Sequence, residues 1–230
     1  MHTKLEICSL LTEPGIIAVV RTQTAAQVLP LSEALLAGGV IAIEITLTTP
    51  NAFQAIRDAR AKFGERALIG VGTVLDETAC KSAIDAGAEF IVTPVCRPAL
   101  VAIAHAAERP IMIGAFSPTE AQTAHEAGAD FIKIFPADML GPAYIKALRA
   151  PLPHLRIIPT GGVELDNVRD FVQAGCVALG VGSALVSSRI LQVADWQGLT
   201  QAASAFVKAI QEARSSRLTG TNTAAKRQLC

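Results

Sequence analysis

Several features are scarce in this sequence of 230 residues, and each scarcity excludes a class of protein. Aromatic residues make up only 4% of the chain, which argues against a surface on which nucleic-acid bases stack. Neither sign of charge is in excess, because 20 basic residues balance 20 acidic ones. Proteins that bind nucleic acids or anionic membranes usually carry a basic excess, so we expect neither partner.

The cysteines are few and scattered, and no Cys-x-x-Cys pair occurs. An odd, dispersed set in a chain of this length favours reduced thiols over a disulfide framework. The N-terminal segment is unlike an export signal, because Glu6, Glu13 and Pro14 interrupt it. One uncharged run, residues 171–188, is long enough for a membrane span, but its glycines and serines favour a buried strand with turns. We therefore expect a soluble, cytoplasmic protein.

A short Ala-Gly motif recurs four times along the chain, at Gly38, Gly87, Gly128 and Gly175. Each copy follows a stretch of helical character and precedes an apolar run. This is expected where a helix ends in a glycine and the chain turns back into a strand. The copies are roughly 40 to 50 residues apart, which is enough for about two strand–helix units in each interval.

Eight short apolar segments are predicted to be strands, separated by segments of helical length. They are residues 16–20, 40–47, 67–71, 90–93, 110–113, 131–135, 156–159 and 177–181. Strands that are apolar almost throughout are typical of parallel sheets covered by helices. Eight such units predict an α/β fold, a single (β/α)8 TIM barrel, with an open doubly wound sheet as the alternative. We expect the barrel domain over residues 1–213, including a short N-terminal helix over residues 3–11, and a flexible, disordered C-terminal tail over residues 214–230.

Two charged residues fall where the barrel core should be. The period of two along residues 42–48 puts Glu44 on the face opposite the large aliphatic side chains, pointing into the barrel. The same arithmetic puts Lys133 on one face with Phe131 and Phe135. A buried salt bridge of purely structural value is one interpretation. We favour a functional one, because burial favours the neutral, nucleophilic amine and perturbed ionisable groups concentrate at active sites.

Glycine-rich segments follow the last two predicted strands, at residues 159–163 and 180–184. Backbone N–H groups in such loops can approach an anion closely, and the start of a following helix adds its positive end. Phosphate sites in these barrels often lie after strands seven and eight. We therefore predict a phosphorylated ligand. The predicted phosphate-binding residues are Gly161, Gly162, Gly182 and Ser183.

Other residues at predicted strand ends are candidates for the mouth of the barrel. Gly72 and Thr73 are suited to presenting backbone amides and a hydroxyl to a carboxylate, and Arg21 and Pro94 follow strands one and four. The four histidines show no paired ligand spacing, which disfavours a metal site and a Ser-His-Asp triad. We expect no metal.

Taken together, several motifs resemble those of the aldolases that act on 2-keto-3-deoxy-6-phosphogluconate (KDPG) and 4-hydroxy-2-oxoglutarate (KHG). The motifs are Glu-Ile-Thr-Leu from residue 44, Gly-Val-Gly-Thr from residue 70, Thr-Pro from residue 93, Phe-Ile-Lys-Ile-Phe-Pro-Ala from residue 131 and Pro-Thr-Gly-Gly from residue 159. They follow in order, and the resemblance covers about residues 16–188. It implies a class I aldolase on a (β/α)8 barrel, without a metal or other cofactor and usually a homotrimer.

The resemblance also implies roles for the matching residues. Lys133 would form a Schiff base with the C2 ketone of the substrate, and Glu44 would shuttle protons. Gly72 and Thr73 would hold the pyruvyl carboxylate, and Phe135 would pack beside the imine. The glycine-loop amides would bind the phosphate of a 2-keto-3-deoxy sugar acid, which is cleaved to pyruvate and D-glyceraldehyde 3-phosphate.

One position departs from the family pattern. Glucose-type enzymes are similar to Glu-Val-Thr-Leu-Arg at the second strand, whereas this chain has Thr48 in place of the arginine. Arg21 is one substitute for the missing charge, and amides alone are another. Aldolases of the galactonate epimer (KDPGal) also lack that arginine, and residues 141–148 look more like theirs. Thr160 instead matches the threonine that favours the gluco epimer. We favour KDPG, with KDPGal as the alternative and KHG as a further substrate.

Two other functions stay open on the sequence. In a phosphate-binding barrel isomerase or epimerase, Glu44 would be the base and Lys133 only an electrostatic stabiliser. A non-catalytic barrel would bind a phosphorylated acid as a sensor or scaffold. An imine between pyruvate and Lys133, trapped by borohydride, would separate the aldolase from the isomerase, and measurable turnover would exclude the sensor.

Overall fold

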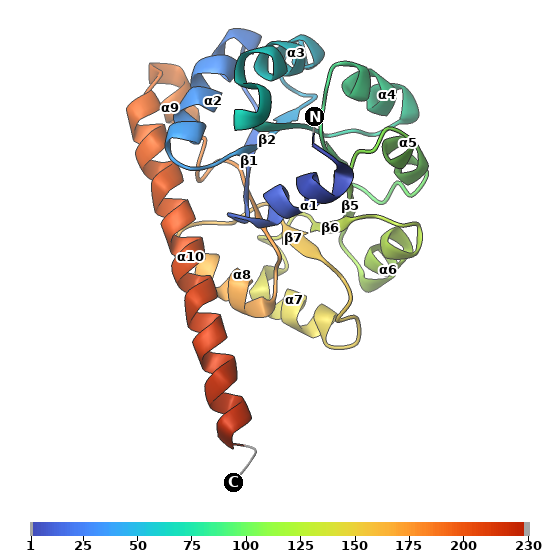
Figure 1. Ribbon diagram of the computed structural model, residues 1–230, viewed down its shortest axis with the longest axis vertical. Coiled ribbons are helices and arrows are strands. Elements are labelled where there is room, and N and C mark those ends of the chain that lie inside the picture. The colour runs from blue at the N-terminus through green and yellow to red at the C-terminus, as the bar shows by residue number, and fades with distance from the viewer. Residues whose placement is uncertain (1, 228–230) are drawn as a thin grey trace.

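Eight parallel strands form one sheet, and Figure 1 shows the strands at the centre of the molecule. The computed structural model describes residues 2–227, with side-chain surroundings described as far as Arg217. The strands are β1 (Ile16–Val20), β2 (Ala42–Thr46), β3 (Leu68–Gly72), β4 (Ile91–Val92), β5 (Ile111–Ala115), β6 (Phe131–Ile134), β7 (Ile157–Pro159) and β8 (Leu179–Val181). Each overlaps a segment that the sequence predicts to be a strand, although β3 and β5 extend beyond the predicted C-terminal ends to Gly72 and Ala115.

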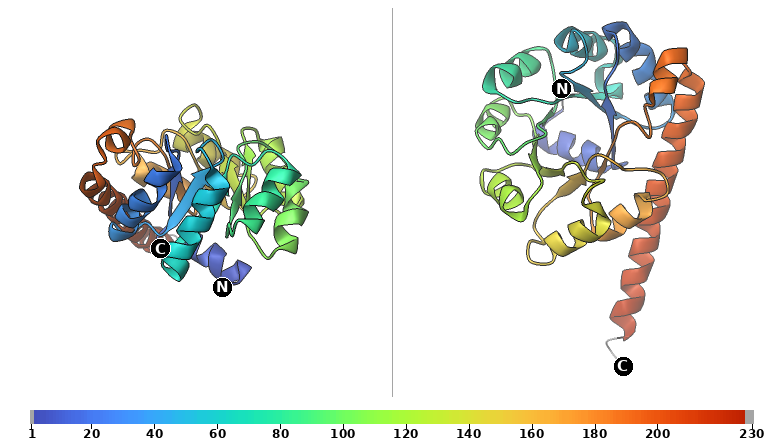
Figure 2. Two further views of the ribbon diagram at one scale, coloured as in Figure 1. Left: turned by 90° about the horizontal axis from the view of Figure 1, so that it is seen from above. Right: turned by 180° about the vertical axis from the view of Figure 1, so that it is seen from behind.

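Helices alternate with the strands and surround them on the outside (Figures 1 and 2). They are α1 (Lys4–Thr12), α2 (Val28–Ala37), α3 (Ala52–Phe63), α4 (Glu77–Asp85), α5 (Leu100–Ala106), α6 (Pro118–Glu126), α7 (Gly141–Arg149), α8 (Val168–Ala174), α9 (Ser188–Val193) and α10 (Trp196–Arg227). Short 3-10 turns, η1 (Ala25–Gln27) and η2 (Gly64–Arg66), precede α2 and follow α3. Within residues 2–227, no helix has both the length and the apolar character needed to cross a membrane.

The strand order closes the sheet into a barrel. Neighbouring strands follow the chain from β1 to β7, and β8 pairs with β1. Between β7 and β8, Thr160 bridges Gly180, and the N–H of Val177 donates to the carbonyl of Ile157 at 3.0 Å. A doubly wound sheet would instead reverse its strand order at a switch point. The predicted (β/α)8 barrel is therefore confirmed.

The barrel has two separate apolar cores, one on each face of the strands. The outer core lies between strands and helices and includes Ile43, Ile45, Ile132 and Ile134. The inner core fills the N-terminal half of the barrel. It consists of Ile17, Ala42, Leu68, Phe90, Val92, Met112, Phe131, Ile158 and Ala178, with Ile7, Cys8 and Leu11 from α1. Successive residues of each strand thus alternate between the two cores, as the period of two requires.

Helix α1 closes the N-terminal end of the barrel, where Figure 1 shows it lying across the opening. A capping box starts the helix: the Thr3 side chain accepts from the N–H of Glu6, and the Glu6 carboxylate accepts from the N–H of Thr3. Ile7 and Leu11 are fully buried in the inner core. Burial of two such side chains stabilises the fold by about 1.5–3 kcal/mol each. The prediction of a short helix before the first strand is confirmed.

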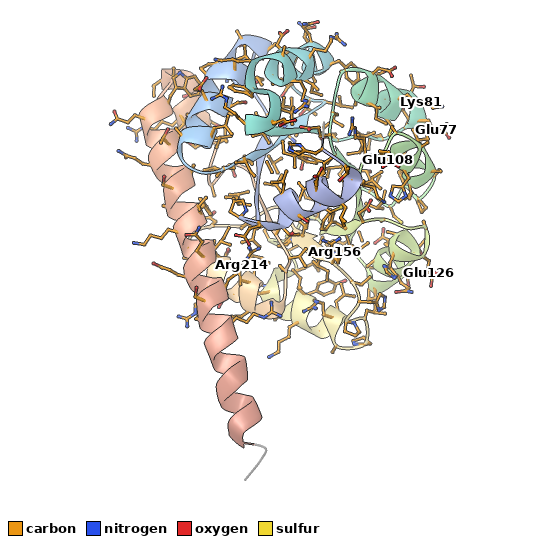
Figure 3. All side chains as sticks on the ribbon, viewed as in Figure 1. Glu77, Lys81, Glu108, Glu126, Arg156 and Arg214 are labelled. Carbon is orange, nitrogen blue, oxygen red and sulfur yellow. The ribbon has the colours of Figure 1, made fainter. Side chains whose placement is uncertain are left out.

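Helix α10 runs along one side of the barrel and contacts α2 and α8 (Figure 1). Arg214, labelled in Figure 3, donates to the Glu13 carboxylate and to the carbonyl of Val177, both at 2.9 Å. Arg217 donates to the carbonyl of Val172 at 3.3 Å. Contacts with the barrel therefore continue past the predicted boundary at residue 213. Residues 228–230 of the predicted tail lie outside the described residues.

Candidate active site

Glu44 and Lys133 meet inside the barrel. Glu44 lies on β2 and Lys133 on β6, and their side chains are only 3% and 6% exposed. The Nζ of Lys133 lies 3.5 Å from Oε1 of Glu44. Their strand neighbours Ile43 and Ile132 belong to the outer core, so both charged side chains point inward as the sequence predicts. An amine and a carboxylate in contact can exchange a proton directly.

Glycines on the inward face make room for this pair. A Cβ on Gly72 would collide with the carboxylate of Glu44. Gly114 is the register partner of Lys133 on β5, and a Cβ there would collide with the backbone of Pro94. Any larger residue at these two positions would displace the carboxylate or the neighbouring strand end. The space around the amine therefore depends on the absence of a side chain at these two positions.

Two phenylalanines, Phe131 and Phe135, lie close to the amine on the same strand and just after it. Phe131 is fully buried in the inner core, two residues before Lys133 on the same face of β6. The ring centroid of Phe135 lies 5.4 Å from the Nζ of Lys133, and this side chain is 38% exposed. The amine thus has apolar side chains on the N-terminal side and an aromatic ring on the C-terminal side of the barrel. Only the C-terminal end of the barrel offers it a route to solvent, because α1 and the inner core close the other end.

A cleft of about 410 Å³ opens beside Phe135 at the C-terminal ends of the strands. Both predicted glycine loops line it. Of the sequence-predicted site residues, the cleft contains Arg21, Phe135, Thr160, Gly161, Gly162, Gly182 and Ser183. The backbone of Gly161 and Gly162 is left-handed, with φ of +92° and +64°. Such conformations can turn backbone N–H groups toward an anion, and Arg21 adds a positive charge to the same cleft.

Of the two helices that follow the glycine loops, only α9 begins at the cleft. α8 starts at Val168, which does not line the cleft, whereas α9 starts at Ser188, which does. In between, the chain makes turns, such as the bond from the N–H of Val186 to the carbonyl of Gly182 at 2.8 Å. An anion in the cleft would therefore meet loop amides and the guanidinium group of Arg21, with the first turn of α9 beside it.

The remaining predicted residues lie on the other side of the pair. Gly72 adjoins Glu44, and Pro94 adjoins Gly114 beside Lys133. Thr73 follows with φ of +64°, a left-handed conformation that is rare for a β-branched residue and typical of functional sites. Thr48 is exposed, and its hydroxyl lies 2.8 Å from the hydroxyl of Thr46. Arg21 lies in the cleft with the glycine loops.

The histidines lie away from this site. His2 and His105 form hydrogen bonds with carboxylates at the N-terminal end of the barrel. The rings of His125 and His154 lie with their centroids 4.5 Å apart between α6 and the segment before β7. In the part of the chain that the structure describes, no three His, Cys, Asp or Glu side chains gather in a way that could hold a metal ion.

Some features of the site are absent from the sequence-based prediction. The period of two along β5 places Gly114 inward, so this glycine was open to prediction from the pattern. Glu164 and Ser188 line the cleft as well. They follow the glycine loops without a pattern that distinguishes them from ordinary surface residues, and only the three-dimensional structure places them there.

Comparisons with known proteins agree with this geometry. The family model described as KDPG and KHG aldolase matches residues 7–202. The chain is 37% identical over 191 residues to a 2-dehydro-3-deoxy-phosphogluconate aldolase of Pseudomonas aeruginosa, covering 83% of this chain and 86% of that relative. It is 36% identical over 203 residues to a 2-dehydro-3-deoxy-6-phosphogalactonate aldolase of Escherichia coli, covering 88% and 97%. A solved structure of KDPG aldolase from Legionella pneumophila, with pyruvate captured as a covalent carbinolamine, matches with a TM-score of 0.81 at 28% identity, covering 87% and 97%.

Proposed function

Because this chain belongs to the KDPG and KHG aldolase family, we propose that it cleaves KDPG to pyruvate and D-glyceraldehyde 3-phosphate through a Schiff base on Lys133. Family membership makes it an aldolase, a carbon–carbon lyase. One observation supports the assignment of the chemistry to residues: a buried lysine amine lies 3.5 Å from a buried glutamate, next to Phe135, which lines the glycine-rich cleft.

The first half of the proposed reaction forms the imine. The neutral amine of Lys133 attacks the C2 ketone, whose oxygen takes up a proton to give a carbinolamine. Glu44, within contact of the amine, removes the proton that the nitrogen sheds and returns one to the C2 hydroxyl. Water leaves, and the nitrogen lone pair forms an iminium ion. Loss of water requires a proton donor near the C2 hydroxyl. Glu44 can supply the proton, because its carboxyl group contacts the nitrogen that is bonded to C2.

The second half breaks the C3–C4 bond. Glu44 takes the proton of the C4 hydroxyl, a C4–O double bond forms, and the C3–C4 electron pair moves into the iminium to give an enamine. The aldehyde D-glyceraldehyde 3-phosphate departs. Glu44 then returns its proton to C3, and water hydrolyses the iminium to release pyruvate and the free amine. The iminium supplies the electron sink, so we propose that no metal or other cofactor takes part. Activity should survive dialysis against EDTA.

The two ends of the substrate have separate binding regions in this proposal. The phosphate occupies the cleft, where it meets the amides near Gly161, Gly162 and Gly182, the Ser183 hydroxyl and Arg21. The carboxylate lies on the other side of the amine, against the residues beside Glu44 and Pro94. These are Gly72, Thr73 and Thr48. Thr160 lies beside Gly180 at the cleft wall, where its hydroxyl can reach the C4 oxygen.

A second candidate substrate is KDPGal, the C4 epimer. Thr48 stands where glucose-type enzymes carry arginine, and the E. coli phosphogalactonate aldolase is as similar to this chain as the glucose-type relative is. Pyruvate release coupled to lactate dehydrogenase measures kcat/KM for KDPG, KDPGal and KHG. We expect the highest value for KDPG. A higher value for KDPGal reverses the choice of epimer, and no turnover of any of the three refutes the proposed function.

We also propose that the enzyme is a homotrimer. Val95, Phe116 and Met139 are exposed apolar side chains on the loops after β4, β5 and β6, three neighbouring strands, and Met139 is 76% exposed. Apolar side chains grouped on one face favour contact with another protein surface. Light scattering should give the mass of three chains, and Met139→Glu should lower it. A monomeric unsubstituted protein contradicts the proposal.

A cytoplasmic location forms part of the same proposal. Cys8, Cys80, Cys96 and Cys176 are free thiols. Burial raises the pKa of Cys80 to about 11 and that of Cys176 to about 12, so both stay protonated and unreactive at neutral pH. Free thiols of this kind fit a reducing compartment.

A further inference from the structure

Asn167 occupies the N-cap position of α8, yet its side chain does not cap that helix. An N-cap asparagine usually accepts a hydrogen bond from an N–H in the first turn of its own helix. Here the amide turns back onto the preceding loop. Its Oδ1 accepts from the N–H of Glu164 at 2.9 Å, and its Nδ2 donates to the carbonyl of Gly162 at 2.8 Å. The side chain therefore bridges two points of the glycine loop.

The bridge fixes the direction of one peptide unit. The only cis peptide bonds in the described chain precede Pro14 and Pro136, so the bond between Gly162 and Val163 is trans. In a planar trans unit the carbonyl and the N–H point in opposite directions. Anchoring the Gly162 carbonyl on Asn167 therefore turns the N–H of Val163 away from Asn167. Val163 and Gly162 both line the cleft.

Two N–H groups of the loop lack a protein partner in the part of the chain that the structure describes. Within the described residues, neither the N–H of Gly162 nor that of Val163 donates a hydrogen bond to the chain. An unpaired backbone donor at a mostly buried position such as Val163 is costly unless it meets water or a ligand. On the opposite side the loop packs against Asp138, since a Cβ on Gly162 would collide with that residue. The loop is thus held between Asp138 and Asn167.

We propose that Asn167 is a positioning residue for the phosphate group of the substrate. By holding the Gly162 carbonyl, it keeps the N–H of Val163 turned to the cleft, where it donates to a phosphate oxygen. The inference rests on the proposed function, because it takes this cleft to be the phosphate subsite. Asn167 does not touch the substrate itself. It should therefore govern affinity for the phosphorylated end and leave the chemistry at Lys133 unchanged.

Two substitutions and a matched control test this role. Asn167→Asp keeps the size and the oxygen that accepts from Glu164, but it loses the donor to the Gly162 carbonyl. Asn167→Ala removes both bonds. Gln173→Glu is the control, because it makes the same amide-to-acid change on the exposed side of the same helix.

The readouts separate phosphate binding from a loss of folded structure. For both Asn167 variants we expect KM for KDPG to rise about tenfold, the effect of one lost hydrogen bond, with kcat changed less than about twofold. The rate of borohydride trapping with pyruvate, which carries no phosphate, should stay at the unsubstituted level. Gln173→Glu should behave like the unsubstituted enzyme. An unchanged KM, or an equal loss of KDPG cleavage and pyruvate trapping, overturns the proposal.

A binding measurement distinguishes failure of this inference from failure of the proposed function. Inorganic phosphate is titrated into the unsubstituted enzyme and into Asn167→Asp by calorimetry, which needs no turnover. We expect the Kd of the variant to be about tenfold higher. Equal Kd values, or no phosphate binding to the unsubstituted enzyme, overturn the inference. Phosphate binding that depends on Asn167 in a chain that cleaves neither epimer supports the inference and refutes only the proposed function.

Discussion

The two ends of the barrel are built from the same strands but have opposite properties. At the N-terminal end, the inner core is closed by α1, and Phe131 and Leu11 are fully buried. At the C-terminal end, the same strand β6 carries Lys133 and leads to the half-exposed Phe135. Phe131, which serves stability, and Lys133, for which we propose a chemical role, are therefore only two residues apart on one strand. The closed end lets the open end carry buried charge and glycine-rich backbone that weaken packing.

Charged groups differ between the ends in how well they are paired. At the N-terminal end, Lys4 lies 2.9 Å from Asp130, and the carboxylate also accepts from the N–H of Ile111 and pairs with His105. Arg156, labelled near α1 in Figure 3, lies 4.2 Å from the ring centroid of Phe131. At the C-terminal end, the partner of Lys133 lies at a looser 3.5 Å. Tight pairing suits a structural role, and the looser pairing of Lys133 fits the role as nucleophile that we propose for its amine.

The largest expected effect comes from removing the amine at the open end. Lys133→Met keeps a similar volume and should lower kcat for KDPG cleavage by at least about 10⁴-fold, or roughly 5.5 kcal/mol, because no imine can form. The substitution leaves the buried carboxylate of Glu44 without its partner, so the melting temperature should fall, and circular dichroism at the assay temperature checks that the variant is folded. Lys146→Met, on the exposed face of α7, is the control and should keep full activity. Cleavage retained by Lys133→Met would rule out the mechanism.

Next in size is the loss of the proton shuttle. Glu44→Gln preserves shape but cannot accept a proton, so kcat should fall by about 10²- to 10⁴-fold. Steady-state assays of pyruvate release measure this. Glu126→Gln on the surface of α6 (Figure 3) serves as the control. If Glu44→Gln retains more than half of the activity, another group moves the proton.

Substitutions at the closed end should lower the stability of the protein and leave its activity unchanged. Leu11→Ala leaves a cavity in the inner core and should lower the free energy of unfolding by about 2–5 kcal/mol, as measured by urea denaturation. The kcat under native conditions should change less than about twofold. Leu5→Ala, on the same helix but 77% exposed, should cost little. Equal effects of the two substitutions would mean that α1 does not close the barrel.

A smaller and pH-dependent effect is expected from the ion cluster at the closed end. Burial raises the pKa of Asp130, but hydrogen bonds from His105, Ile111 and Lys4 more than offset this and leave it below its usual value. A carboxyl with a lowered pKa stabilises the fold above its unfolded pKa, near 4, and loses that stabilisation as the pH falls through the lowered value.

Asp130→Asn should therefore lower the free energy of unfolding by about 1–3 kcal/mol at pH 7. The difference from the unsubstituted protein should shrink below about pH 4. Asp85→Asn, an exposed position on α4, is the control. Urea denaturation at several pH values measures both, and a difference that is constant with pH would contradict the role given to the Asp130 carboxylate.

Most of the fold could be predicted because the barrel repeats one local pattern. Apolar runs, glycine-ended helices and the period of two placed all eight strands and turned Glu44 and Lys133 inward. Strand ends were harder to place. β4 spans only Ile91–Val92 because the Thr93 side chain bonds with the backbone of Val95 and starts a turn. The pattern of apolar residues does not show where a side chain forms hydrogen bonds with the backbone and so ends a strand.

The inward position of the charged pair could be predicted from the sequence, but the detailed geometry around it could not. Burial cost singles out Lys133 and Glu44, and glycines mark the loops that we propose to bind an anion. Which residues share a cleft depends on how the loops fold. Arg21 joins the glycine loops, whereas α8 begins too late for its N-terminus to contribute. Asn167 resembles an ordinary helix cap in the sequence, and its hydrogen bonds to the glycine loop appear only in three dimensions.

Trapping of the imine tests the central claim most directly. The enzyme is incubated with pyruvate and sodium borohydride, digested, and analysed by mass spectrometry for a reduced pyruvyl group. The structure predicts one adduct, on Lys133, that is absent from Lys133→Met. An adduct on a different lysine, or none under conditions in which the enzyme releases pyruvate from KDPG, would contradict the account.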